Sequence, residues 1–255
     1  MYLNHLNLIG YGFVGKAVYN FLKDKHTINI VDPHYNDNIL HYNTDGYIVC
    51  VPTPTDDNDG SCDMSTVYDV LKTIPEQSNV LIKSTISLEG WKYIKNKFDE
   101  LKIAFSPEFL TAVNASEDLD NEKNILLGGT SLEFWYNVFN QCKPKDAQLA
   151  NIEELILAKY ARNSFLATKV TFFNELYDLC QETEIDYDTV KELVGMDDRI
   201  SIGHTQVPGP DGKRGFGGAC FPKDTLALKA TYEANGVESY LLNKVIDINY
   251  KMREK

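Results

Sequence analysis

The stretch Gly10-Tyr11-Gly12-Phe13-Val14-Gly15 decides the fold of this chain. The apolar run Leu6–Ile9 before it predicts a strand, and Lys16–Lys23 behind it has the apolar spacing of a helix. A second predicted strand, Thr27–Asp32, ends in an acid 22 positions after the first glycine. Glycines between a strand and a helix, with a carboxylate closing the next strand, are typical of a dinucleotide-binding βαβ unit.

The same residues indicate which dinucleotide binds. Glycines let a pyrophosphate reach the helix N-terminus, and Asp32 would accept hydrogen bonds from ribose hydroxyls. That carboxylate repels a ribose 2′-phosphate, and no lysine or arginine lies between Asp32 and Lys72. The sequence therefore predicts NAD rather than NADP; the alternative is a tight turn that binds nothing. The predicted contacts from this region are Gly10, Gly12, Phe13, Val14, Gly15 and Asp32.

Further apolar segments predict more strands of one sheet. They are Gly46–Val51, Asn79–Thr85, Lys102–Glu108 and Asn124–Gly129. Helical or acidic connections separate them, which predicts a Rossmann-type, doubly wound parallel sheet. Ligands bind outside the carboxyl ends of such strands, where Thr53, Thr85 and Glu108 are expected. The acidic loop from 56 to 63 lacks the terminal glutamate of a calcium loop, so we expect a solvated connection.

The composition changes near residue 150. Ile152–Glu184 contains no glycine or proline and is apolar on more than one face, which predicts one long helix covered by other elements or by a second subunit. Shorter helices are expected around Tyr187–Val194, Thr225–Ala234 and Glu238–Arg253. We therefore expect an α/β domain over residues 1–150 and an all-helical domain over residues 151–255.

One cysteine stands in an unusual setting within Arg214–Asp224. Cys220 follows the pair Gly217-Gly218 closely and precedes a helix expected to begin near Asp224. The glycines let a ligand approach the sulfur, and a helix N-terminus favours the thiolate. The neighbouring Lys223 acts in the same direction. We expect Cys220 to be a nucleophile; the alternative is a buried structural cysteine in a glycine turn.

Composition and charge exclude several classes of function. The net charge of −12 argues against nucleic acid and anionic membrane surfaces as partners. The five cysteines form no Cys-x-x-Cys pair and the five histidines are scattered, so neither a disulfide framework nor a metal site is predicted. No apolar run reaches membrane-spanning length and no secretory signal opens the chain. We expect a reduced, cytoplasmic protein.

Seven motifs, in order along the chain, give it a resemblance to a known family. They are 10–15 (GYGFVG), 51–54 (VPTP), 83–85 (KST), 106–110 (SPEFL), 159–163 (KYARN), 198–200 (DRI) and 215–224 (GFGGACFPKD). The chain resembles the UDP-glucose/GDP-mannose dehydrogenase family, which oxidises the C6 alcohol of a nucleotide sugar to a carboxylate with two NAD. The resemblance implies a nucleotide-sugar substrate, UDP-glucose first among the candidates.

The resemblance also implies roles for individual residues. Cys220 would be the nucleophile, while Asp224 and Thr85 would position a water. Glu108 would serve as acid–base, and Lys159 with Asn163, one helical turn apart, would face the oxyanion. The implied substrate contacts are Glu108, Phe109, Leu110, Lys159, Asn163, Arg199 and Gly217, and the further cofactor contacts are Thr53, Thr85 and Lys223. Arg199 would reach across a dimer toward the partner's sugar nucleotide.

Some features depart from the family pattern. Ala112 stands where the family usually has a glutamate near the cofactor, and Pro208–Lys213 makes the segment before the cysteine motif longer than expected. Family members usually continue into a second α/β domain that binds the nucleotide, whereas this sequence stops at Lys255 within its last predicted helix. A separate chain that supplies the nucleotide-binding domain is one expectation.

Three functions therefore stay open on the sequence alone. The first is an active NAD-dependent nucleotide-sugar 6-dehydrogenase, favoured because an idle protein has no need of Cys220, Lys159 and Asn163 together. The second is a catalytically idle NAD-binding dimer module that needs a partner chain. The third is a two-electron 3-hydroxyacid dehydrogenase, whose chemistry requires no cysteine. Apolar residues around the predicted long helix further predict a homodimer.

Overall fold

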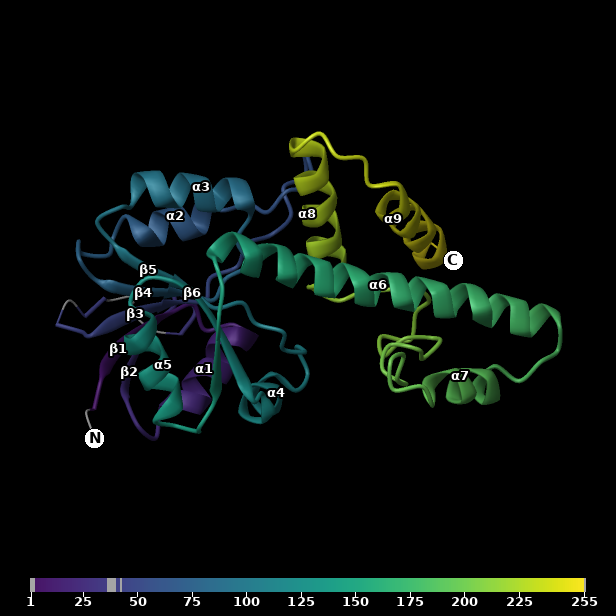
Figure 1. Ribbon diagram of the computed structural model, residues 1–255, viewed down its shortest axis with the longest axis horizontal. Helices are drawn as coiled ribbons and strands as arrows, with labels where there is room; N and C mark the ends of the chain where they lie inside the picture. The colour runs from purple at the N-terminus through teal and green to yellow at the C-terminus, as the bar shows by residue number, and fades with distance from the viewer. Residues whose placement is uncertain (1–2, 36–39, 42, 255) are drawn as a thin grey trace. The chain divides into compact units, whose positions relative to one another are not determined.

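The structure, a computed structural model, describes residues 3–35, 40–41 and 43–254 (Figure 1). They divide into two compact units. Unit 1 comprises the described residues up to Pro54 together with Cys62–Lys159. Unit 2 comprises Thr55–Ser61 together with the described chain from Tyr160 onward. The expected domains 1–150 and 151–255 stay predictions, because a compact unit need not be one that folds on its own.

The described part of unit 1 contains a seven-stranded sheet in the order β2-β1-β3-β4-β5-β6-β7. The strands are β1 (His5–Ile9), β2 (Thr27–Val31), β3 (Gly46–Val49), β4 (Asn79–Ile82), β5 (Lys102–Phe105), β6 (Asn124–Gly129) and β7 (Asp146–Leu149). Within this described sheet the neighbours pair in parallel, except β5 and β6, which are antiparallel. The predicted doubly wound sheet is confirmed, with one antiparallel pair that the sequence pattern did not reveal.

Helices cover both faces of this sheet. In Figure 1, α2 (Ser65–Leu71) and α3 (Leu88–Lys97) lie on one face. On the other lie α1 (Phe13–Leu22), α4 (Ala115–Asn121) and α5 (Leu132–Asn140). The core on this second side joins strand residues such as Leu8 and Ile48 to Trp135 and Phe139 of α5. Burial on both faces explains why the central strands are continuous apolar runs.

The strand order places a ligand site at one point of the sheet. β1 pairs with β2 on one side and with β3 on the other, so the direction of winding reverses between β1 and β3. In doubly wound sheets, ligands bind outside the carboxyl ends of the strands at this reversal. Gly10 follows β1 there, and Cys50 follows β3.

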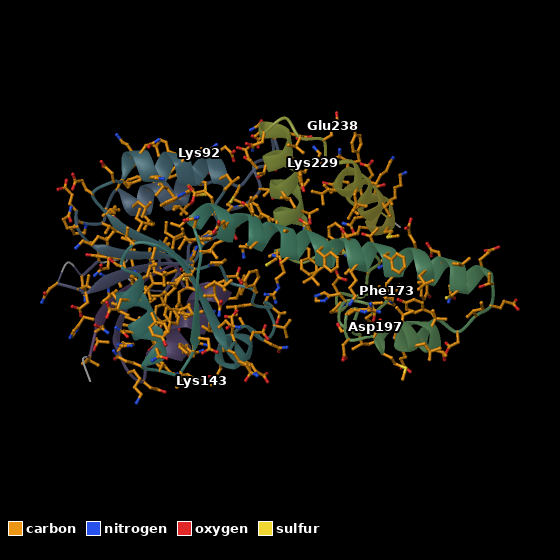
Figure 2. All side chains as sticks on the ribbon, viewed as in Figure 1. Lys92, Lys143, Phe173, Asp197, Lys229 and Glu238 are labelled. Atoms are coloured by element: carbon orange, nitrogen blue, oxygen red, sulfur yellow. The ribbon has the colours of Figure 1, made fainter. Side chains whose placement is uncertain are left out.

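Unit 2 is helical. Its elements are α6 (Ile152–Glu182, from Tyr160 onward), α7 (Tyr187–Gly195), α8 (Phe221–Ala234) and α9 (Tyr240–Arg253). The predicted long helix is confirmed and ends two residues early, before Glu184 adopts a left-handed backbone (φ +55°). Phe173 of α6, labelled in Figure 2, is buried and packs in a cluster with Tyr187.

Two sequence features can be checked over the described residues. No helix in this part of the chain is long and apolar enough to cross a membrane. Within the same ranges, no group of three or more His, Cys, Asp or Glu side chains lies close enough together to hold a metal ion.

Candidate active site

The glycine loop after β1 has the shape that a dinucleotide requires. Gly10 has a φ of +92°, and a Cβ there would lie 2.5 Å from the Cys50 carbonyl oxygen. A Cβ on Gly15 would lie 2.1 Å from the Gly10 carbonyl oxygen. By contrast, a Cβ on Gly12, the N-cap of α1, would meet no atom within 4 Å. Two glycines thus allow the tight turn, and the third leaves open space at the helix N-terminus, where a pyrophosphate binds.

Asp32 is held beside this loop. It directly follows β2, and its carboxylate oxygens accept hydrogen bonds from the backbone N–H groups of Tyr11 (2.7 Å) and His34 (2.9 Å). A carboxylate has about four lone-pair sites, so ribose hydroxyls can donate to it as well. Phe13 and Val14 lie half-buried in the first turn of α1. These residues fit NAD, with Asp32 for the adenosine ribose and the loop for the pyrophosphate.

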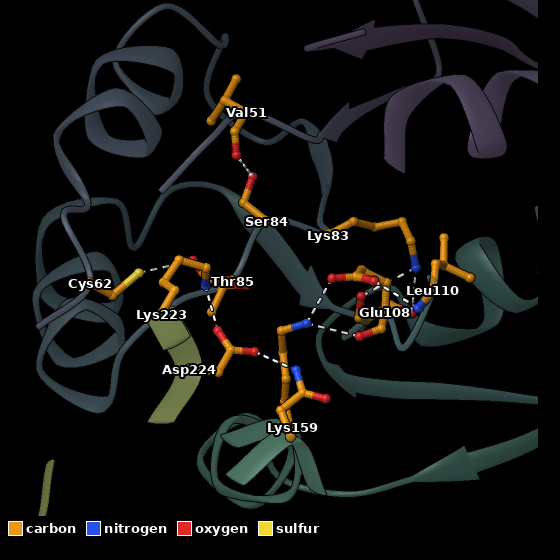
Figure 3. Close-up of polar contacts among 12 residues, drawn as sticks. Val51, Cys62, Lys83, Ser84, Thr85, Glu108, Leu110, Lys159, Lys223 and Asp224 are labelled. Atoms are coloured by element: carbon orange, nitrogen blue, oxygen red, sulfur yellow. Dashed lines mark hydrogen bonds and ion pairs between the residues drawn. The ribbon is translucent and has the colours of Figure 1, made fainter. Parts of the chain in front are cut away.

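Side chains join the carboxyl ends of β3, β4 and β5 (Figure 3). Ser84 Oγ donates to the Val51 carbonyl oxygen (2.8 Å), and Lys83 Nζ donates to the carbonyl and hydroxyl oxygens of Ser106 (both 3.2 Å). Burial lowers the pKa of Lys83. Thr53 and Thr85 are buried beyond β3 and β4, and their carbonyl oxygens accept weak hydrogen bonds from the Cys62 thiol.

A buried ion pair lies beyond β5 (Figure 3). Lys159 Nζ donates to Glu108 Oε1 and to the Glu108 carbonyl oxygen, each at 2.8 Å. The other carboxylate oxygen accepts from the Leu110 N–H (2.9 Å), and the Phe109 ring centroid lies 5.9 Å from Nζ. The two side chains are only 2% and 7% exposed. A proton donor and a proton acceptor are therefore held together away from water.

In unit 2, Cys220 is the N-cap of α8. The helix begins at Phe221 rather than near Asp224 as expected, because Pro222 fits a first turn, where no backbone N–H is needed. Cys220 is half-buried, whereas three of the other cysteines are buried. Burial raises the pKa of Cys50 to about 12 and that of Cys142 to about 11. Those two thiols stay protonated at neutral pH, and Cys220 alone of the five lies at a helix N-terminus.

Asp224 lies in the first turn of α8 with 1% of its surface exposed. Its carboxylate accepts a hydrogen bond from Asn163 Nδ2 (2.6 Å) and pairs with the Lys223 ammonium. Unit 2 thus brings together Asn163, Lys223 and Asp224. The sequence assigned Asn163 to the oxyanion and Lys223 to the cofactor; both roles stay predictions.

Two other expected substrate residues lie in loops of unit 2. Arg199 follows α7, is 89% exposed on its side chain, and donates to the Asp197 carboxylate (Nε to Oδ1, 2.9 Å). Gly217 lies against the Arg253 guanidinium, which a Cβ would approach to 2.6 Å.

Sequence reasoning missed two buried asparagines. Asn174 of α6 and Asn249 of α9 hydrogen-bond to the backbone of Gly215 and Phe216 in the loop before Cys220. The available signal in the sequence was weak: Asn174 follows Phe172 and Phe173, and Asn249 lies between Ile248 and Tyr250.

The fold and the glycine loop define a dinucleotide-binding α/β protein. Residues 40–138 match the NAD binding domain of the UDP-glucose/GDP-mannose dehydrogenase family, and residues 153–251 match the central domain of that family. The chain belongs to this family and carries its NAD-binding domain, so the predicted family and cofactor are confirmed.

Known proteins extend the comparison. UDP-glucose 6-dehydrogenase of Rickettsia bellii (strain RML369-C) is 34% identical over 229 residues, 84% of this chain and 51% of that protein. The chain thus spans about half the length of the curated relatives it matches. A UDP-glucose dehydrogenase structure from the hyperthermophilic archaeon Pyrobaculum islandicum has a TM-score of 0.84 at 25% identity, covering 98% of this chain and 68% of that one.

A 3-hydroxyisobutyrate dehydrogenase structure from Mycobacterium tuberculosis has a TM-score of 0.76 at 18% identity. The match covers 98% of this chain and 94% of that one. At this identity the likeness shows the fold alone.

Proposed function

We propose that this chain is the catalytic part of an NAD-dependent nucleotide-sugar 6-dehydrogenase that converts UDP-glucose to UDP-glucuronate. The observation that carries the proposal is Cys220, a half-buried thiol at the N-terminus of α8, close in sequence to the buried Asp224. A helix N-terminus favours the thiolate. The relatives named UDP-glucose 6-dehydrogenase support UDP-glucose as the substrate.

The first oxidation gives an aldehyde at C6. When bound, NAD accepts the hydride that leaves C6. Glu108 is proposed as the acid–base group for the hydroxyl proton, because its carboxylate already accepts from Lys159 Nζ and can exchange a proton along that contact. Burial of this pair, at 2% and 7% exposure, keeps water from competing for the proton.

The second oxidation passes through the cysteine. The Cys220 thiolate forms a bond to the aldehyde carbon, and the carbonyl electron pair moves to oxygen, giving a thiohemiacetal. Loss of the hydroxyl proton and of a second hydride from C6, with a second NAD as the hydride acceptor, gives a thioester. Asp224 and Thr85 are proposed to position the water that attacks it; the carbon–sulfur bond then breaks, the thiolate leaves and the carboxylate forms.

Charge develops on oxygen in each of these additions. Lys159 and Asn163 are proposed as the donors that stabilise it, since both side chains are buried and carry N–H groups. An amide nitrogen has two N–H donors, so the bond from Asn163 to Asp224 occupies one of them. Removing one such donor typically lowers the rate about 10²–10³-fold.

Replacing the cysteine tests the proposal. Cys220→Ala should abolish UDP-glucuronate formation and leave NAD binding nearly unchanged, measured by product chromatography and by calorimetric titration of NAD. Cys142→Ala, at a half-buried thiol whose pKa is raised by burial, is the matched control. A Cys220→Ala protein that still forms the acid at a comparable rate would show that another group is the nucleophile.

Two alternatives make different predictions. A 3-hydroxyacid dehydrogenase would form one NADH per substrate and tolerate loss of Cys220, because its chemistry requires no cysteine. An idle NAD-binding module would form no NADH with any nucleotide sugar, even at high protein concentration.

We further propose a homodimer formed through α6. Phe165, Phe172 and Leu179 lie seven residues apart on that helix, so they share one face, and they are 70%, 58% and 59% exposed. A twofold dimer would cover such a stripe. Arg199, whose side chain is 89% exposed, is proposed to approach the partner's substrate.

All five cysteines are free thiols. This supports a reducing compartment, and we propose the cytosol.

A further inference from the structure

The loop Arg214–Ala219 leads into Cys220, and we propose that Asn249 and Asn174 are positioning residues that set its path. Both asparagines and the loop belong to unit 2. Both side chains hydrogen-bond to the backbone of this loop, so each acts on Cys220 through that backbone.

Asn249 binds both polar groups of one loop residue. Its Oδ1 accepts from the Phe216 N–H (2.7 Å) and its Nδ2 donates to the Phe216 carbonyl oxygen (3.1 Å). The side chain is 6% exposed on α9. A carboxamide offers an acceptor and a donor side by side, which an ionised carboxylate or an aliphatic side chain cannot do. Because both the N–H and the carbonyl oxygen of Phe216 are bound, the backbone of this residue can neither shift nor rotate without losing a hydrogen bond.

The loop is shaped to receive this amide. Gly215 has a φ of +71°, and a Cβ there would lie 2.4 Å from Asn249 Oδ1. Arg253, one turn further along α9, packs its guanidinium on Gly217 and donates to the Asp211 carboxylate (2.7 Å) and the Arg214 carbonyl oxygen (3.3 Å). The long segment Pro208–Lys213 thus contributes Asp211 to the same arrangement.

Asn174 binds the preceding residues from a different helix. Its Oδ1 accepts from the Gly215 N–H (3.0 Å) and from Arg214 Nε (3.1 Å), and its Nδ2 donates to the Val170 carbonyl oxygen within α6 (2.9 Å). The side chain is 1% exposed. Two consecutive backbone N–H groups, those of Gly215 and Phe216, are therefore bound by asparagines of α6 and α9.

These bonds set the path of the loop that enters α8 at Cys220. The buried Phe216 ring packs in a cluster with Ala167 and Val245, but apolar packing alone permits sliding, whereas hydrogen bonds fix direction. Cys220 lies four positions after Phe216, and two of the three residues between them are glycines, which give the loop little stiffness of its own. Misplacing a reacting atom by about 1 Å can lower a rate about 10²-fold.

The test compares Asn249→Ala, which loses both bonds, and Asn249→Asp with the wild-type chain. Asn243→Ala, the same change on the same helix at a residue bonded to Ser239, is the control. The rate of Cys220 alkylation by iodoacetamide, measured by mass spectrometry of its peptide, needs no dehydrogenase activity. The values of kcat and KM are measured alongside, and the melting temperature checks folding.

For Asn249→Ala we expect alkylation of Cys220 to slow at least about threefold. The kcat should fall about ten- to a hundredfold, with the KM for NAD within about twofold of wild type. For Asn249→Asp we compare the rate of Cys220 alkylation with the wild-type rate at each pH. We expect this ratio to rise as pH falls from about 8 to about 5.5, because a protonated carboxyl regains a hydrogen-bond donor. If Asn249→Ala does not fold, the pH dependence of Asn249→Asp decides the assignment.

The assignment would be overturned if Asn249→Ala had the same Cys220 alkylation rate and the same kcat as the wild-type chain. It would also be overturned if the ratio of the Asn249→Asp alkylation rate to the wild-type rate did not change with pH. The kcat arm rests on the proposed function, whereas the alkylation arm does not. A wild-type chain that oxidises no nucleotide sugar would therefore refute the proposed function, and the alkylation rates would still decide the role of Asn249.

Discussion

Removing Lys159 should destabilise unit 1 strongly. Lys159→Met keeps most of the side-chain volume but takes the ammonium from Glu108, whose side chain is 7% exposed. The carboxylate then keeps its hydrogen bond from the Leu110 backbone N–H, at 2.9 Å. Leaving one charge of a buried pair without its partner costs about 3–5 kcal/mol. We expect a loss near the lower end, about 3 kcal/mol, because that backbone hydrogen bond persists.

Fluorescence can follow this unfolding selectively. The two tryptophans of the chain, Trp91 and Trp135, both belong to unit 1, so their emission during denaturant unfolding reports on that unit. Lys92→Met, at an exposed lysine labelled in Figure 2, is the matched control and should change the free energy of unfolding by about 0.5 kcal/mol or less.

A double variant separates charge from packing. Lys159→Met with Glu108→Gln removes both charges and should recover at least about half of the lost stability, since no buried carboxylate remains. A loss below about 1 kcal/mol for Lys159→Met, or a double variant no more stable than the single one, would refute a buried, mutually dependent pair.

Three further predictions concern charge, cofactor choice and assembly. Burial lowers the pKa of Lys83, so the unfolded chain holds that proton more tightly than the folded chain does. The cost of the buried cation is absent above the ordinary lysine pKa, grows as pH falls toward the lowered folded pKa, and is fully present below it. Lys83→Met should therefore be more stable than wild type near pH 7 and lose this advantage toward pH 10.5 in denaturant titrations, and a pH-independent difference would contradict this. NAD should be strongly preferred over NADP, and Asp32→Ala should narrow the ratio of their kcat/KM values; similar values in the wild type would show that Asp32 does not select the cofactor. Light scattering across a dilution series should report a dimer that Phe172→Asp dissociates, and a folded, active wild-type monomer at nanomolar concentration would refute the proposed α6 interface.

The sequence predicted the sheet well because burial leaves a simple pattern. Strands covered on both faces appear as apolar runs, as in β3 and β4. β7 was missed because all four residues of Asp146–Leu149 are exposed, so no apolar run marks it. The predicted strand Asn79–Thr85 was too long: β4 ends at Ile82, after which Lys83 and Ser84 hydrogen-bond to the ends of neighbouring strands.

The sequence predicted which residues belong to the candidate site, but it could not predict which of their side chains contact one another. Glu108 and Lys159 are 51 positions apart, and Asn163 and Asp224 are 61 apart, so only the fold shows that each pair meets. Asn249 was missed for a related reason: on the sequence, one asparagine in an amphipathic helix looks like a solvated position, and only the approach of Phe216 gives it partners.

The number of NADH molecules formed per UDP-glucose consumed tests the proposed reaction most directly. NADH is followed by its absorbance while UDP-glucose and its product are quantified in the same sample by chromatography. Oxidation of the C6 alcohol through a Cys220 thioester predicts two NADH per UDP-glucose, with UDP-glucuronate as the product. One NADH per substrate with accumulation of the aldehyde, or no NADH at all, would contradict it.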